Sequence, residues 1–325
     1  MLTLKEINDN REEVIRKLAR RNFDALDIID SIIKLDETRR NSQTSLDGNL
    51  SEINALSKSI GNMMREGKKD EAEQTKKQVS DLKELNKGIE SDLNSAESQI
   101  HELLVVIPNL PHDSVPEGKT AEDNLVERSG GENPTLHDGA MPHWDLAKKY
   151  DLIDFELGVK IAGAGFPVYK GKGSRLQRAL INFFLDSARD AGFIEVQPPY
   201  VVNSASGFGT GQLPDKEGQM YHVGLDDLYL IPTAEVPVTN IYRDVILDEA
   251  DLPIKNTAYS ACFRREAGSY GKDVRGLNRL HQFDKVEIVC IDKPENSYQR
   301  LEEMVNYVQS LVEKLELPWR ILRLC

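Results

Sequence analysis

The sequence predicts an α+β chain in which an N-terminal antiparallel helical hairpin, a coiled coil, precedes an antiparallel β-sheet flanked by helices. The first 107 residues contain no proline and no cysteine, and their single aromatic residue is Phe23; all 14 prolines lie from Pro108 onward. An apolar heptad repeat runs through residues 72–103. Beyond residue 166, strand-like segments separated by long loops outnumber βαβ units, which favours antiparallel pairing.

The hairpin is predicted from a seam whose members are spaced alternately three and four residues apart, the spacing of a coiled coil. Its members are Ala72, Thr75, Val79, Leu82, Asn86, Ile89, Leu93, Ala96, Ile100 and Leu103. A looser apolar stripe, with members Ile28, Ile32, Leu35, Leu46, Leu50, Ile53, Leu56, Ile60 and Met63, precedes it. Gly67 supplies the turn between two arms of about 35 residues, each ~50 Å long. Residues 1–27 form a short helical lead-in.

Composition restricts the class of protein. The chain carries 41 Lys and Arg against 54 Asp and Glu, a formal charge of −13, and has no run of about 18 apolar residues that could cross a membrane. Its start has neither the apolar core of a signal peptide nor the character of a transit peptide. Cys262, Cys290 and Cys325 lack CxxC spacing, which disfavours a disulfide framework and a structural zinc site. We therefore expect a cytoplasmic protein.

The hairpin is nearly neutral but unevenly charged. Residues 1–100 hold 17 basic and 20 acidic side chains. The basic residues cluster as Arg39 and Arg40, Lys68 and Lys69, and Lys76 and Lys77. Such clusters are candidates for binding nucleic-acid phosphates. A coiled coil that only dimerises, with these charges on its solvated face, is the alternative.

We expect three parts: the hairpin arm over 1–105, a Pro- and Gly-rich linker over 106–165, and a sheet domain over 166–325. The linker contains one amphipathic segment, 143–154. In the sheet domain, helices are predicted at 175–190 and 295–315. Strands are predicted at 193–202, broken by Pro198 and Pro199, and at 228–242, 259–267, 279–291 and 319–325. The glycine-rich segments lack the spacing of a P-loop or a dinucleotide-binding turn.

One constellation carries chemistry. Arg264 ends a predicted strand, and Arg279 opens the next one after a loop, so the pattern places both over one sheet face, where they could grip a polyphosphate. Phe283 offers a flat face for a base. Glu287 follows on the same side of the strand as Phe283 and Lys285 and could accept from an ammonium or hydroxyl. An amphipathic hairpin with surface arginines has the same pattern.

These residues resemble a known family. FRRE (263–266), a loop, and RLHQF (279–283) look like motif 2 of class II aminoacyl-tRNA synthetases, and FIEVQPP (193–199) looks like their motif 1. Thr233-Ala234-Glu235, the stretch from Arg264 to Glu287, and the order of hairpin, linker and sheet are similar to seryl-tRNA synthetases of the bacterial kind. The resemblance covers the whole chain.

The resemblance implies a serine–tRNA ligase that forms seryl-adenylate from L-serine and ATP and passes the seryl group to tRNA(Ser). Arg264 and Arg279 would be catalytic. The implied ATP ligands are Arg264 on the α-phosphate, Arg265, Glu266 on the adenine amino group, Arg279 on the outer phosphates, and Phe283 stacked on adenine. The implied serine pocket is formed by Thr233, Ala234, Glu235, Arg264 and Glu287. Pro198 would lie at a homodimer interface. The basic clusters of the hairpin, Arg39, Arg40, Lys68, Lys69, Lys76 and Lys77, would contact the tRNA.

The family's third motif and the acidic ligand of its Mg²⁺ are expected after Cys325, so we expect a chain cut short before motif 3, with no metal ligand of its own. An impaired homologue that binds tRNA or ATP without turnover is the alternative to an active ligase. A coiled-coil protein whose globular end merely dimerises fits the motif 2 hairpin less well.

Overall fold

The computed structural model describes residues 2–266 and 275–325. It divides into two compact units, Met1–Arg128 with Ile321–Cys325, and Ser129–Arg320.

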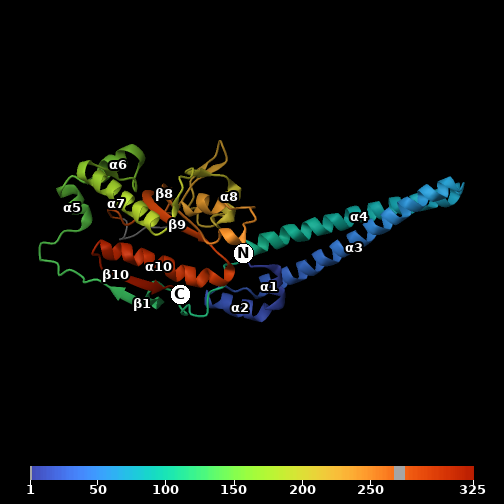
Figure 1. The fold of residues 1–325 in the computed structure, drawn as a ribbon, viewed down its shortest axis with the longest axis horizontal. Coiled ribbons are helices and arrows are strands. Elements are labelled where there is room, and N and C mark those ends of the chain that lie inside the picture. The colour runs from blue at the N-terminus through green and yellow to red at the C-terminus, as the bar shows by residue number, and fades with distance from the viewer. Residues whose placement is uncertain (1, 267–274) are drawn as a thin grey trace. The chain divides into compact units, whose positions relative to one another are not determined.

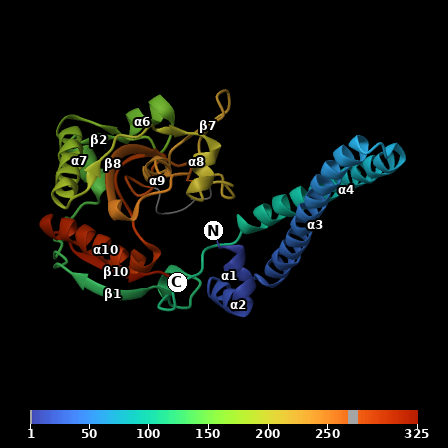
Figure 2. The ribbon, with the colours of Figure 1, turned by 45° about the vertical axis from the view of Figure 1, so that its right-hand side comes forward.

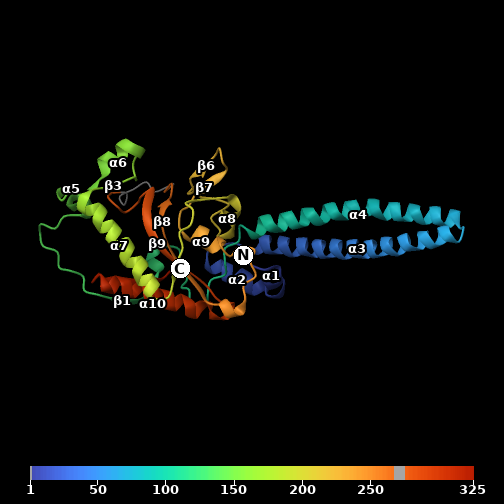
Figure 3. The same cartoon turned by 45° about the horizontal axis from the view of Figure 1, so that its top comes forward.

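The first unit is dominated by the hairpin of α3 and α4, which lie side by side along their length (Figures 1 and 3). Its elements are α1 (Leu4–Asp9), α2 (Arg11–Arg20), α3 (Leu26–Arg65), α4 (Lys69–Leu104), the 3₁₀ turn η1 (Ala121–Asp123) and β1 (Leu125–Gly130), which pairs with β10 (Trp319–Arg323). Gly67, at the tip, has φ 77°, a conformation that glycine adopts without strain. The predicted antiparallel hairpin is therefore confirmed.

The heptad seam on α4 is confirmed position by position. All ten predicted members are buried or half-buried, including Asn86, whose Oδ1 accepts a 2.8 Å hydrogen bond from Asn49 Nδ2 across the seam. On α3, Ile29 and Asp36 are buried next to the predicted members Ile28 and Leu35, which are half-buried, and the predicted member Leu50 is exposed.

The base of the hairpin is built around a buried carboxylate. The Asp36 side chain is 4% exposed; its Oδ1 accepts from Arg39 Nη2 at 2.8 Å and its Oδ2 from Asn8 Nδ2 at 2.9 Å. Arg40 Nε lies 3.2 Å from Asp36 Oδ2. Two of the arginines predicted to contact RNA thus neutralise a buried acid that ties α1 to α3.

The second unit contains short sheets and the helices that cover them (Figure 2). Its helices are α5 (His143–Lys149), α6 (Phe155–Ala162), α7 (Gly171–Asp190), α8 (Ser204–Gly209), α9 (Glu235–Asn240) and α10 (Ser297–Lys314), with 3₁₀ turns η2 (Glu249–Asp251) and η4 (Pro294–Asn296). Its strands are β2 (Ile153–Asp154), β3 (Val168–Tyr169), β4 (Ile194–Glu195), β5 (Val201–Val202), β6 (His222–Val223), β7 (Leu228–Leu230), β8 (Ile254–Phe263) and β9 (Gln282–Ile291).

The long antiparallel pair β8–β9 is the frame of this unit. Its register runs from Ile254 opposite Ile291 to Phe263 opposite Gln282. The strand β4 joins the other side of β8 in parallel, so the sheet is mixed. The helix α7 packs against both long strands and is seen beside them in Figure 3.

Three predicted elements differ from the structure. The strand predicted over 228–242 ends at Leu230, and 235–240 is helical. Ala234 and Val238 pack into one apolar cluster and Val236 into another, which a helix permits, whereas a strand would place all three side chains on one face. The segment 143–154 forms α5 and then β2 instead of one helix. The strand predicted from 279 begins at Gln282, so Arg279 precedes it.

Replacement of Arg39 by alanine tests the buried carboxylate. Asp36 would lose one of its charged donors, so we expect the opening free energy of α1 and the base of α3 to fall by about 1–3 kcal/mol. Hydrogen exchange of the intact chain measures this locally. Lys77→Ala, an exposed site on α4, is the control and should change it by less than about 0.5 kcal/mol. Equal exchange in both variants would refute the role given to Asp36.

Candidate active site

Arg264 and Phe283 come together at the open end of the β8–β9 pair. The Arg264 guanidinium lies 5.1 Å from the centre of the Phe283 ring, a cation–π contact. Its Nε donates to the Pro232 carbonyl at 3.3 Å, and its backbone N–H donates to the His281 carbonyl at 3.0 Å. Arg264 is therefore fixed at its backbone and at Nε.

A polar cluster lies on the same face as Phe283. Glu287 Oε2 accepts from Thr233 Oγ1 at 2.7 Å and is 2.5 Å from Lys285 Nζ. Phe283, Lys285 and Glu287 occupy alternate positions of β9, so one sheet face presents all three, as the sequence predicted. Thr233 reaches Glu287 although 54 residues separate them.

Glu266 and Arg279 pair across the ends of the loop that joins β8 to β9. Arg279 Nη1 lies 3.0 Å from Glu266 Oε2; the side chains are 54% and 15% exposed. Glu266 has φ 49°, a left-handed conformation that a non-glycine residue adopts at some cost. The structure thus brings Glu266 to Arg279, an ion pair that the sequence did not predict.

Arg265 is directed elsewhere. Its N–H donates to the Gln219 carbonyl at 2.8 Å, its Nε to the Met220 carbonyl at 3.1 Å, and its guanidinium lies 4.9 Å from the Tyr221 ring centre. Its contacts hold the 219–221 segment against the end of β8.

The other predicted site residues differ in exposure. Ala234 is fully buried, while Glu235 is exposed at the start of α9, where its N–H donates to Thr233 Oγ1 at 3.1 Å. Pro198 is buried between β4 and β5. Glu235 therefore lies next to Thr233 at the surface, whereas the neighbouring Ala234 is in the interior.

Sequence reasoning missed the residues that hold the start of β9. His281 donates its N–H to the Gly165 carbonyl at 2.9 Å, stacks on Phe166 at 5.4 Å, and shares a 2.6 Å hydrogen bond between Nδ1 and the Tyr221 hydroxyl. A Cβ on Gly165 would lie 2.3 Å from the His281 ring. No local pattern links these residues, although Gly165 in a Gly-rich stretch could have indicated a close approach.

Two titratable groups lie in the β8–β9 ladder, one on each face of the sheet: Cys262 on the face of Phe283, and Tyr259 on the opposite face. Cys262 pairs with Phe283 in the ladder and has no exposed surface, and this burial raises the pKa of its thiol. Burial also raises the pKa of the nearby Tyr259 phenol, whose hydroxyl donates to Asp284 Oδ1 at 2.6 Å. Both groups stay neutral at physiological pH.

The remaining basic candidates lie near the hairpin tip. Lys68 and Lys76 form ion pairs with Glu66 at 2.8 Å and Glu73 at 3.0 Å. Lys69 and Lys77 are exposed and form no ion pair within the described parts of the chain.

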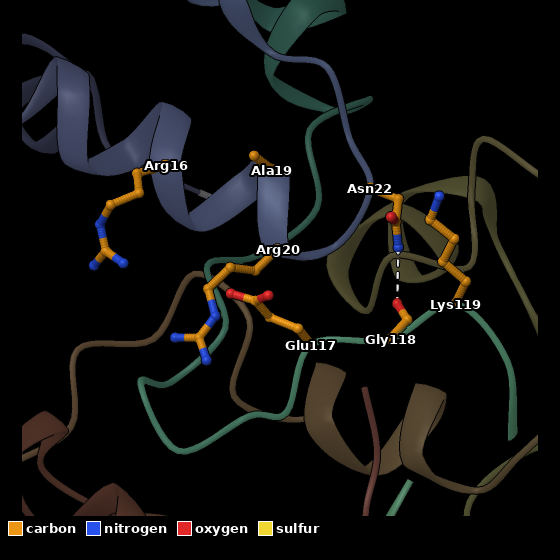
Figure 4. Close-up of a pocket in the computed structure, with 7 residues that line it drawn as sticks. All are labelled: Arg16, Ala19, Arg20, Asn22, Glu117, Gly118 and Lys119. Atoms are coloured by element: carbon orange, nitrogen blue, oxygen red, sulfur yellow. Dashed lines mark hydrogen bonds between the residues drawn. The ribbon is translucent and has the colours of Figure 1, made fainter. Parts of the chain in front are cut away.

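A cavity of about 800 Å³ lies at the end of α2 in the first unit (Figure 4), lined by Arg16, Ala19, Arg20, Asn22, Glu117, Gly118 and Lys119. Two of its cations are already engaged. Arg16 pairs with Glu13, and Arg20 donates to the carbonyls of Asp113 and Val115. Asn22 closes one side through a 2.9 Å bond from Nδ2 to the Gly118 carbonyl. These contacts give the residues that line the cavity a structural role, and no ligand is needed to account for them.

Within residues 2–266 and 275–325, no three side chains of His, Cys, Asp or Glu converge as a metal site would require. None of the helices described there is sufficiently long and apolar to cross a membrane.

Comparison with known proteins defines first the class and then the family. Residues 221–325 match the class II core domain of the tRNA synthetases for Gly, His, Pro, Ser and Thr, so the site region is a class II aminoacyl-tRNA synthetase core. Residues 1–111 match the seryl-tRNA synthetase N-terminal domain. The serine–tRNA ligases of Salinibacter ruber and Nautilia profundicola are 48% and 46% identical to the whole chain, which spans 76% and 78% of their lengths. The chain belongs to the seryl-tRNA synthetase family.

Solved structures agree with this assignment. Seryl-tRNA synthetase from Pyrococcus horikoshii, complexed with ATP, superposes with a TM-score of 0.91 at 31% identity over 99% of this chain and 76% of that one. The cytoplasmic serine–tRNA ligase of Naegleria fowleri, in complex with AMP, gives 0.84 at 25% identity, covering 99% and 77%. The predicted α+β fold with its helical hairpin is thereby confirmed.

The buried thiol of Cys262, the cross-strand partner of Phe283, gives a test of the pairing between β8 and β9. We expect Cys262 to be alkylated at least about tenfold more slowly than Cys325 at pH 8, because both its burial and its raised pKa lower the accessible thiolate. Mass spectrometry of alkylated peptides measures both rates in one sample. Urea should equalise them. Rapid native labelling of Cys262 would contradict the β8–β9 register.

Proposed function

We propose that these residues form the serine-activating site of a serine–tRNA ligase. L-serine attacks the α-phosphate of ATP, giving seryl-adenylate and pyrophosphate, and the seryl group then passes to tRNA(Ser). The observation that carries this proposal is the cluster of Arg264, Phe283 and the Thr233–Glu287–Lys285 group on one face of β8–β9. It combines a phosphate clamp, a stacking surface and an amino-acid pocket.

Arg264 is proposed as the catalytic clamp of the α-phosphate. One Nε bond to the Pro232 carbonyl aims the guanidinium while leaving the planar pair of terminal nitrogens to a phosphate. Because its backbone is fixed on His281, the arginine is positioned before substrate arrives, and preorganised charge of this kind stabilises the transition state. Serine's carboxylate would bind the same guanidinium during attack.

The nucleotide is proposed to exchange partners with the Glu266–Arg279 pair. The adenine amino group would donate to Glu266, and the outer phosphates would accept from Arg279, which is about half exposed and therefore weakly held by its present partner. Adenine would stack on Phe283. Arg265 is assigned to holding the 219–221 segment of the pocket wall, on the basis of its contacts there.

The serine pocket is proposed to be the polar group around Glu287. Its carboxylate, with Thr233 and Glu235 beside it and Ala234 beneath, can accept from the ammonium and hydroxyl of serine. Alanine would leave polar groups without partners, a penalty of up to about 10⁴-fold in sites built for a hydroxyl. Threonine keeps the hydroxyl and is the harder competitor to reject.

Several further parts belong to the proposal. Mg²⁺ would accompany ATP, although no three side chains of His, Cys, Asp or Glu converge as a site for it among the described residues. We propose a homodimer through the second unit near Pro198, and a reducing, cytoplasmic location that suits three free cysteines. The third family motif is proposed to come from sequence beyond these 325 residues.

The chemistry is tested in a chimera that continues after Cys325 with the corresponding C-terminal part of the Salinibacter ruber ligase. It should catalyse serine-dependent exchange of pyrophosphate into ATP, with alanine a far weaker substrate. Arg264→Ala should lower kcat/KM by about 10²–10³, as for loss of one transition-state donor elsewhere. Arg265→Ala is the matched control and should retain more activity.

Near-normal exchange in Arg264→Ala would overturn the clamp. Absence of exchange in the unsubstituted chimera, once shown to be folded by circular dichroism, would overturn the proposed function itself.

The hairpin is proposed to bind the tRNA backbone near its tip, because Lys69 and Lys77 are the predicted basic residues free of ion pairs there. We expect Lys69→Ala with Lys77→Ala to weaken tRNA(Ser) binding by the 325-residue chain. Each lost phosphate contact should reduce the slope of log affinity against log salt by roughly 0.7–0.9. Fluorescence anisotropy at several salt concentrations measures both. Lys83→Ala, exposed on the same helix, is the control; an unchanged slope in the double variant would exclude the tip.

A further inference from the structure

The first residue of α5 holds the far end of the loop between β8 and β9. His143 Nε2 accepts a 2.8 Å hydrogen bond from the N–H of Leu277, which lies 134 residues later. Trp144 packs edge-on against the imidazole at 4.9 Å, and the Arg275 guanidinium lies 5.9 Å from the Trp144 ring centre. Two consecutive side chains of α5 therefore contact three consecutive residues of the loop end.

Only glycine is compatible with this contact at position 276. Its φ is 66°, and a Cβ built there would lie 2.1 Å from His143 Nε2 and 2.8 Å from two ring carbons. Contacts under 3 Å are not tolerated by real side chains, so the backbone passes directly against the imidazole. The conformation and the clearance both require glycine.

The anchored segment leads directly into the nucleotide site. Arg279 is two residues beyond Leu277 and pairs with Glu266. Two residues further, His281 is fixed by Gly165 and Tyr221. Arg279 therefore stands between two anchors: His143 on one side and the His281 contacts on the other.

We propose that His143 is a positioning residue for Arg279. Its Nε2 accepts from the Leu277 N–H and so limits where the Arg279 side chain can be placed. This reduces the conformational entropy that ATP binding would otherwise have to remove. The inference rests on the proposed role of Arg279 in binding the outer phosphates, and it adds a residue from outside the recognised motifs.

The anchor itself is measured in the 325-residue chain without reference to activity. His143→Ala should increase hydrogen exchange of the peptide that contains residues 275–282, and His143→Gln, whose carbonyl reaches about as far as Nε2, should restore part of the protection. His137→Ala is the matched control, because His137 also accepts a backbone N–H, from Gly139 at 3.0 Å, but within its own turn. Unchanged exchange in His143→Ala would overturn the anchor.

The consequence for the site is measured in the chimera with the Salinibacter ruber C-terminal part. Loss of one hydrogen bond that orders Arg279 should raise the KM for ATP about 5- to 10-fold, with the KM for serine changed less than about twofold. His143→Gln should recover part of the ATP effect. A global folding defect would raise both constants or lower kcat alone, and either pattern would overturn the proposal.

A substitution at Gly276 provides an independent test of the contact with His143. Gly276→Ala should raise the KM for ATP because its Cβ collides with the imidazole, and it should raise it less when combined with His143→Ala, which removes the collision. Additive effects would overturn the direct contact. If the unsubstituted chimera does not exchange pyrophosphate into ATP, the proposed function fails, and the role of Arg279 fails with it. The hydrogen-exchange measurement on the 325-residue chain still decides whether His143 holds Leu277.

Discussion

The antiparallel ladder between β8 and β9 is the constraint on which the site depends. Its ten residue pairs put Phe283, Lys285 and Glu287 on one face, and a slip of one residue would turn all three to the opposite face. Buried polar groups help fix that register. Thr257, fully buried, donates from Oγ1 to the Glu287 carbonyl at 2.9 Å, so a slipped ladder would lose a bond that the interior cannot replace. The polar interior of the sheet thus specifies alignment as well as stability.

Features that depend on interactions between residues close in sequence could be predicted, and features that depend on contacts between distant segments could not. The heptad seam and the alternation along β9 are written in consecutive residues, and both agree with the structure. The bond between Thr233 and Glu287 and the clamp around His281 join distant segments, which no local pattern encodes. The segment 235–240 is predicted as strand because its valines favour strands, whereas in the structure Val236 and Val238 pack into different clusters on two sides of a helix.

Charge in the hairpin shows a different limit. Composition places Arg39 and Arg40 among the basic residues that a nucleic acid could attract, but it cannot show which acids are buried beside them. Asp36 sits at a position of the seam where an apolar residue is expected, and both arginines turn toward it. A buried carboxylate needs such partners, because its desolvation is otherwise unfavourable by several kcal/mol. Both arginines therefore contribute to the base of the hairpin, and their predicted contact with tRNA stays a prediction.

The cations of the site share a property that bears on ligand choice. Arg264 rests on an aromatic face, Arg279 on Glu266 and Lys285 on Glu287, so none waits as an uncompensated charge. Exposed pairs of this kind contribute about 0–1 kcal/mol, whereas a hydrogen bond to a charged group contributes about 1.5–3 kcal/mol. A phosphate can displace such partners only if the ligand also satisfies the carboxylates left behind. ATP offers an amino group beside its phosphates, and serine offers an ammonium beside its carboxylate. The ion pairs of Arg279 with Glu266 and of Lys285 with Glu287 therefore favour ligands that carry both an anion and a donor.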